Sequence, residues 1–151
     1  VVGISSSPRS LPGFDEMRKR AELANAVRDL DFLIILTPHN QDTHHSVSTE
    51  VLVAMKPSSF IINLARGGVV DEDALVKALQ AKTIAGAALD VFAVEPLPAD
   101  SPLWGLKNVL ISPHLGGFSQ ESSRHTMPAL LHNMRAFLKG DFEGMVNKIA
   151  R

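Results

Sequence analysis

A short apolar run that ends in a lone arginine constrains the fold of this chain more than any other stretch. The run covers residues 60–64, and Arg66, two glycines and an acidic cluster from Asp71 follow it. Apolar runs of this length are typical of strands buried on both faces in parallel sheets. Glycines beside the arginine allow the backbone to come close to a ligand. The stretch therefore predicts an α/β fold with one guanidinium at the end of a buried strand.

The rest of the chain repeats this alternation of apolar runs and amphipathic segments. Strands are predicted over residues 1–4, 32–36, 60–64, 84–89 and 108–112. Helices are predicted from Phe14 to Leu30, over 47–55, after an Asp71 cap, and over a long segment that includes 127–138 and stops at Gly140. Pro128 is expected to kink this last helix or to mark a late start. Alternating strands and helices indicate βα units, and the predicted fold class is α/β with a doubly wound parallel sheet.

Composition narrows the classes of protein that this chain can belong to. Its 151 residues carry a formal net charge of −1 and no cysteine. The charge balance speaks against nucleic acid and acidic membrane surfaces as partners, and no apolar run approaches the roughly 18 to 20 residues of a membrane span. We therefore expect a cytoplasmic protein without disulfides. Because the chain starts without Met and inside a predicted strand, we also expect it to be a fragment.

Distinctive polar residues fall at the carboxyl ends of the predicted strands. They are Ser5 to Arg9, Thr37-Pro38, Ala65 to Gly67, Asp90, and His114 with Gly116-Gly117. The carboxyl ends of parallel strands meet at one edge of the sheet, where ligands of such folds bind. This convergence predicts a functional site at that edge.

Each candidate has an ordinary structural alternative. Arg66 could pair with Asp71 or Asp73, Glu95 could be a solvated carboxylate, and His114 could be a hydrogen-bonded loop residue. Together they suit a definite chemistry, because a guanidinium binds a carboxylate in bidentate fashion. A carboxylate beside an imidazole stabilises its protonated form, which can then donate a proton near neutral pH. The three residues fit reduction of a 2-oxo acid by hydride from a cofactor.

The remaining histidines do not predict a metal site. His39, His44 and His45 share one polar loop, but apart from Asp42 no carboxylate or cysteine accompanies them. Ligand sets of structural or catalytic zinc usually need more than this.

Three motifs carry a resemblance to a known family. They are residues 63–71, residues 86–92 followed by Glu95-Pro96, and residues 112–114 followed by Gly116-Gly117. In this order they resemble the D-isomer-specific 2-hydroxyacid dehydrogenases. Related formate dehydrogenases carry Gln in place of Glu95, which favours a hydroxy acid over formate.

The resemblance implies a role for each site residue. Arg66 would bind the substrate carboxylate, His114 would act as general acid/base, and Glu95 would orient the histidine. Asp90 would lie near the nicotinamide carboxamide. Arg66 and His114 would also border the cofactor, together with Thr37, Pro38, Leu64, Ala65 and Gly116.

The residues after the first strand bear on the choice of cofactor. An acidic residue there usually binds the ribose hydroxyls of NAD, whereas an arginine accommodates the 2′-phosphate of NADP. The chain has Ser5, Ser6 and Arg9 instead of an acid. This favours NADPH over NADH, with the alternative that Arg9 points to solvent and the serines tolerate either cofactor.

The resemblance also bears on what the chain contains. The family's Gly-rich phosphate loop and substrate domain would precede Val1, so residues 1–151 are expected to form a partial Rossmann-like dinucleotide-binding domain, incomplete at its N-terminal side. Its last residues would lead toward the substrate domain, and the fragment alone should bind dinucleotide weakly and be inactive. The full-length protein would be a homodimeric oxidoreductase of the glyoxylate or hydroxypyruvate reductase kind. The alternative is a dehydrogenase-like, cofactor-sensing corepressor.

Overall fold

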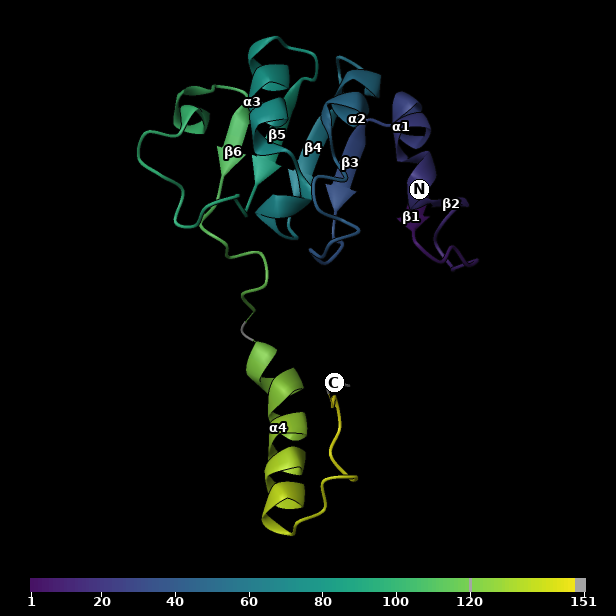
Figure 1. Ribbon diagram of the computed structural model, residues 1–151, viewed down its shortest axis with the longest axis vertical. Coiled ribbons are helices and arrows are strands. Elements are labelled where there is room, and N and C mark those ends of the chain that lie inside the picture. The colour runs from purple at the N-terminus through teal and green to yellow at the C-terminus, as the bar shows by residue number, and fades with distance from the viewer. Residues whose placement is uncertain (120, 149–151) are drawn as a thin grey trace. The chain divides into compact units, whose positions relative to one another are not determined.

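The computed structural model describes residues 1–119 and 121–148 and divides into two compact units, Val1–Gly116 and Gly117–Arg151 (Figure 1). Most of unit 1 is built around a parallel sheet of four strands. These are β3 (Phe32–Ile35), β4 (Phe60–Asn63), β5 (Gly86–Leu89) and β6 (Val109–Ile111), and they lie side by side in chain order. The register pairs Leu33 with Ile61 and Ile61 with Ala87. The predicted parallel, Rossmann-like α/β architecture is confirmed.

Two helices connect neighbouring strands of this sheet, α2 (Thr49–Ala54) between β3 and β4 and α3 (Glu72–Gln80) between β4 and β5. Asp71 caps α3 as predicted, because its Oδ1 accepts the Ala74 N–H at 3.0 Å. This bond satisfies one of the amides that a helix start leaves without a partner. The acidic first turn also suits the helix dipole.

The two faces of the four-stranded sheet differ in burial. Leu33, Ile35 and Ile61 are buried in the core on the face that the helices cover, whereas Phe32 and Ile34 are more than half exposed. Figure 1 shows α2 and α3 on the same side of the sheet. Because successive strand residues point to opposite faces, the apolar runs place large side chains on the bare face as well.

The first residues of the chain form a separate pair of strands, β1 (Val2–Ser5) and β2 (Glu16–Lys19), which are parallel to each other. The predicted helix from Phe14 to Leu30 is therefore wrong over its first part. Its helical part is α1 (Leu23–Ala26) with a 3-10 turn on each side, η1 (Arg20–Glu22) and η2 (Val27–Asp29). The spacing of three between Phe14 and Met17 has another cause, because both side chains lie over Gly3 of β1.

Unit 2 contains one long helix, α4 (Ser122–Leu138). Pro128 lies inside it, so the alternative that this proline marks a late start is wrong. Gly140 follows the helix with φ +71°, and its N–H donates to the Phe137 carbonyl at 3.0 Å, which confirms the predicted stop. The prediction that the last residues lead toward another domain falls partly on residues 149–151, outside the described part. Within the described residues no helix has both the length and the apolar character that crossing a membrane requires.

Candidate active site

The turn that carries Arg66 is built on a buried amide at the end of β4. Asn63 is 1% exposed, and its Oδ1 accepts the Ala65 N–H at 3.0 Å. Its Nδ2 donates to the Arg66 carbonyl at 3.1 Å. Asn63 thus holds the turn from inside. No role was predicted for Asn63, although a polar residue at the end of a buried strand was the available signal.

The side chain of Arg66 makes no ion pair within the described residues. Its Nη1 donates to the Ala65 carbonyl at 2.6 Å, and no carboxylate there lies within the 4.0 Å of a salt bridge. Asp71 caps α3 instead. The alternative that Arg66 is a structural partner of Asp71 or Asp73 is therefore wrong, and its guanidinium keeps its capacity to bind an anion.

The two glycines after Arg66 let this turn fit closely against two neighbouring loops. A Cβ on Gly67 would lie 1.9 Å from the Phe92 carbonyl carbon and 2.4 Å from the Ala93 nitrogen. A Cβ on Gly68 would lie 2.8 Å from the ring of His39. Gly67 thus lets the Arg66 turn lie directly against the segment that leads to Glu95, and Gly68 lets it lie against the His39 loop.

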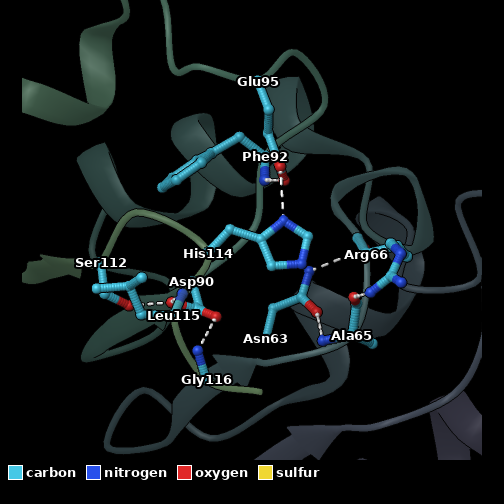
Figure 2. Close-up of polar contacts among 10 residues, drawn as sticks. All are labelled: Asn63, Ala65, Arg66, Asp90, Phe92, Glu95, Ser112, His114, Leu115 and Gly116. Carbon is cyan, nitrogen blue, oxygen red and sulfur yellow. Dashed lines mark hydrogen bonds and ion pairs between the residues drawn. The ribbon is translucent and has the colours of Figure 1, made fainter. Parts of the chain in front are cut away.

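His114 and Glu95 form a direct pair in the loops after β6 and β5. His114 Nδ1 lies 2.7 Å from Glu95 Oε2, and Glu95 Oε1 accepts the Phe92 N–H at 3.0 Å (Figure 2). Figure 2 shows the imidazole between Glu95 and the turn that carries Arg66. Since Nδ1 is engaged by Glu95, Nε2 is the ring nitrogen that is left for a ligand.

The environment keeps Glu95 ionised. Burial by itself would raise the pKa of Glu95, but hydrogen bonds from His114 and the Phe92 amide, with the charges of His114 and Arg66, bring this pKa below its ordinary value. The carboxylate can therefore stabilise an imidazolium at His114.

Asp90 connects β5 to the loop that carries His114. It is 3% exposed, and its Oδ1 accepts the Ser112 hydroxyl at 2.5 Å and the Leu115 N–H at 2.8 Å. Its Oδ2 accepts the Gly116 N–H at 2.7 Å. These bonds enclose His114, whose φ of +55° lies in the left-handed region that most residues avoid.

The same contacts determine the ionisation of Asp90. Burial would raise the pKa of Asp90, but the bonds from Ser112, Gly116 and Leu115, with the charge of His114, bring this pKa below its ordinary value. Each carboxylate oxygen offers about two acceptor positions, so Oδ2 retains one for another donor. Ser112 belongs to the motif at residues 112–114, but no role was predicted for it.

The residues predicted to border the cofactor fall into three groups. Leu64, Ala65, Asp90 and Gly116 adjoin the Arg66–Glu95–His114 cluster: Leu64 is 46% exposed, and a Cβ on Gly116 would lie 3.4 Å from Leu64 Cδ2. Thr37 and Pro38 follow β3, where the Pro38 carbonyl accepts the Thr43 hydroxyl at 2.7 Å.

The third group, Ser5, Ser6 and Arg9, lies at the end of β1. Within the described residues no hydrogen bond or ion pair connects it to the cluster. Arg9 is exposed and has no carboxylate within ion-pair distance in that part of the chain. A cavity of about 340 Å³ adjoins it, lined by Pro8, Arg9, Ser10, Leu11, Phe14, Asp15, Glu16 and Met17.

The histidine loop after β3 is organised by contacts between its own rings. His39 Nε2 and His44 Nδ1 are 3.0 Å apart, and the ring of His44 stacks on that of His45 with centroids 3.9 Å apart. In the part of the chain that the structure describes, no three His, Asp or Glu side chains are grouped as a metal site requires.

A guanidinium without an acidic partner in the described residues, a carboxylate–imidazole pair and an exposed apolar side chain thus share one edge of a parallel sheet. Residues 1–116 match the sequence profile of the D-isomer specific 2-hydroxyacid dehydrogenase, NAD binding domain. The chain belongs to this family. The predicted resemblance is confirmed.

Individual relatives agree with the family match. The chain is 45% identical over 130 residues to glyoxylate/hydroxypyruvate reductase B of Pectobacterium carotovorum, and the match covers 85% of this chain and 41% of that protein. It therefore spans less than half the length of such curated relatives.

Solved structures of the family superpose on almost the whole chain. A D-isomer specific 2-hydroxyacid dehydrogenase from Xanthobacter autotrophicus, in complex with NADPH and MES, has a TM-score of 0.85 at 34% identity and covers 99% of this chain and 60% of its own. An NADPH-dependent glyoxylate/hydroxypyruvate reductase from Sinorhizobium meliloti, with NADP and malonate, has a TM-score of 0.78 at 35% identity and covers 89% of this chain and 41% of its own.

Proposed function

We propose that the complete protein reduces small 2-oxo acids to D-2-hydroxy acids with NADPH. The observation that carries the proposal is the 2.7 Å contact between His114 Nδ1 and Glu95 Oε2 at the sheet edge that also holds Arg66. Membership of the family supports the reaction class, and the relatives' names support glyoxylate and hydroxypyruvate as substrates.

Arg66 binds the carboxylate of the 2-oxo acid. Its guanidinium has no acidic partner within the described residues, and a bidentate bond to a carboxylate would orient the substrate as well as hold it. Asn63 fixes the backbone from which Arg66 extends. The substrate carbonyl is thereby directed toward His114.

His114 donates the proton. Glu95 engages Nδ1 and stabilises the imidazolium, so the Nε2 proton passes to the carbonyl oxygen as the carbonyl carbon is reduced. The product is the hydroxy acid, and the histidine is left neutral. In the oxidation direction the same nitrogen accepts the hydroxyl proton.

The residues present fit a nicotinamide dinucleotide. When bound, NADPH supplies the hydride that adds to the carbonyl carbon. Leu64 offers an exposed apolar surface beside Gly116, and Asp90 Oδ2 retains an acceptor position for a carboxamide N–H. Arg9, Ser5 and Ser6 suit the 2′-phosphate of NADPH. The relatives from X. autotrophicus and S. meliloti are themselves complexes with NADPH and NADP.

Turnover by the complete protein tests the proposal. With NADPH, we expect reduction of glyoxylate and hydroxypyruvate, and Arg66→Lys should lower kcat/KM by about 10- to 100-fold because lysine cannot form the bidentate bond. Arg28→Lys makes the same exchange at an exposed position of η2 and should leave the rate unchanged. Absence of turnover would contradict the proposal and favour the cofactor-sensing module.

We further propose that residues 1–151 alone bind dinucleotide weakly and turn over no substrate. A helix start with a Gly-rich loop binds the pyrophosphate in such folds, and the chain contains no Gly-x-Gly-x-x-Gly. Calorimetric titration of residues 1–151 with NADH and NADPH tests this, and micromolar affinity would contradict it. The homodimer and the cytoplasmic location stay predictions.

A further inference from the structure

We propose that Glu72, in the first turn of α3, is a positioning residue for the Glu95–His114 pair. The proposal rests on the function proposed above, and it assigns to the active site a side chain that touches none of its three catalytic residues. Glu72 acts through the Glu95 turn, which is the segment of residues 92–95 after β5.

The contact that supports this role joins two elements far apart in the chain. Glu72 Oε2 accepts the Ala93 N–H at 2.9 Å, across a separation of 21 residues. The preceding amide, Phe92 N–H, donates to Glu95 Oε1 at 3.0 Å. Two consecutive amides of one turn therefore each bind a carboxylate, one from Glu72 and one from Glu95. A shift of this turn moves both bonds together.

Glu72 is itself held in a rigid setting. The Asp71 cap fixes the start of α3, and Ala74, Leu75, Ala78 and Leu79 anchor the helix in the core. Glu72 as a residue is half-buried, and a hydrogen bond to a carboxylate is about twice as strong as one between neutral groups. The close approach of Gly67 to the Phe92 carbonyl also limits movement of the turn. Glu72 and Gly67 thus hold the Glu95 turn between α3 and the Arg66 turn.

Asp73 provides a matched comparison within the same helical turn. It is acidic and exposed, and its charge interacts favourably with the helix dipole in the same way as that of Glu72. Within the described residues Asp73 accepts no hydrogen bond, whereas Glu72 bonds Ala93. Glu72→Ala and Asp73→Ala therefore remove the same charge from the helix start, but only the first releases the Glu95 turn.

The first test is the pH dependence of kcat for 2-oxo acid reduction by the complete enzyme. Glu72→Ala should lower kcat by about tenfold, since small displacements of catalytic groups have effects of this size or larger. It should also move the alkaline limb of the profile to lower pH, because a displaced Glu95 stabilises the imidazolium less. Arg66 and Asp90, the other charges acting on the pair, are unchanged. Glu72→Gln keeps an acceptor oxygen and should restore most of kcat.

The second test measures the local stability of the Glu95 turn and does not depend on enzymatic activity. The measurement is hydrogen–deuterium exchange of the Ala93 amide in the complete protein, followed in a peptide spanning residues 91–96. In Glu72→Ala this exchange should become on the order of tenfold faster. In Asp73→Ala it should remain at the wild-type rate. A purely structural role through α3 would instead give both variants the same exchange and the same pH profile, and would overturn the proposal. If the exchange difference appears but the wild type reduces no 2-oxo acid, the proposed function fails and the positioning of the turn stands.

Discussion

The loops that carry the proposed catalytic residues and the loop that would select the cofactor are held in very different ways. Asp90 binds three donors of the His114 loop, and Glu95 binds both its own turn and His114. Within residues 5–10, the described structure has a single side-chain hydrogen bond, from the Ser7 N–H to Ser5 Oγ at 3.2 Å. The protein itself thus preorganises the groups proposed to transfer the proton, whereas the loop that includes Arg9 leaves its charge for a ligand. Preorganised charge is what catalysis requires.

Replacing Asp90 should have the largest effect. In Asp90→Asn an NH2 group replaces one of the two acceptor oxygens, so it faces either the Gly116 N–H or the two donors at Oδ1. Because a donor then meets a donor, the free energy of unfolding should fall by about 1–3 kcal/mol. Release of the His114 loop should lower kcat by about 100-fold. Urea unfolding and turnover of the complete enzyme measure both.

Asp100→Asn is the control for this replacement. It makes the same chemical change at an exposed carboxylate of the proline-rich segment, which accepts no side-chain hydrogen bond in the described residues. Equal effects of the two variants would show that the bonds of Asp90 do not hold the loop.

The two glycines after Arg66 should differ in their tolerance of a methyl group. In Gly67→Ala the new Cβ collides with the Phe92 backbone, which cannot move without disturbing the Glu95 turn. We expect a loss of about 1–3 kcal/mol in stability and a loss of activity. In Gly68→Ala the obstacle is the His39 ring, an exposed side chain that can rotate away. Thermal unfolding of both variants tests this, and equal destabilisation would contradict it.

Acid should weaken the loops that carry Glu95 and His114 before the rest of the fold. The pKa values of Asp90 and Glu95 lie below their ordinary values. Their stabilisation is therefore fully present above about pH 5, where both carboxyls are ionised in the unfolded chain as well, and is lost as the pH falls through their folded-state pKa values. Urea unfolding at a series of pH values should show this loss, and Asp90→Asn should make the acid slope shallower. An unchanged slope in that variant would exclude Asp90 as a source.

Arg9 should have the smallest effect, limited to cofactor choice. Arg9→Ala should raise the KM for NADPH by about tenfold through loss of a charge-assisted bond to the 2′-phosphate, with kcat and unfolding unchanged because Arg9 is exposed and makes no ion pair within the described residues. The KM for NADH serves as the internal control. An unchanged preference between the cofactors would exclude Arg9 from selecting them.

Local patterns were sufficient for much of the fold. Strands β3 to β6 and the Asp71 cap followed from apolar runs and helix-start chemistry, because burial and capping depend on neighbouring residues. The strand β2 was missed, because the spacing of Phe14 and Met17 imitated a helix while both side chains packed on Gly3. The His114–Glu95 contact was expected from their placement after neighbouring strands, and the structure confirms that they meet.

The sequence by itself determined the order of the βα units and the types of polar residue at the sheet edge, since both are encoded in short stretches. Only the tertiary structure decided how these residues are held. Asn63 inside the Arg66 turn, Asp90 beneath the His114 loop and Glu72 against Ala93 all depend on the geometry of folded turns. The contacts of Asp90 and Glu72 join residues 21 to 26 positions apart, which meet only after parallel strands have formed. No local pattern encodes that proximity, because the register of the sheet creates it.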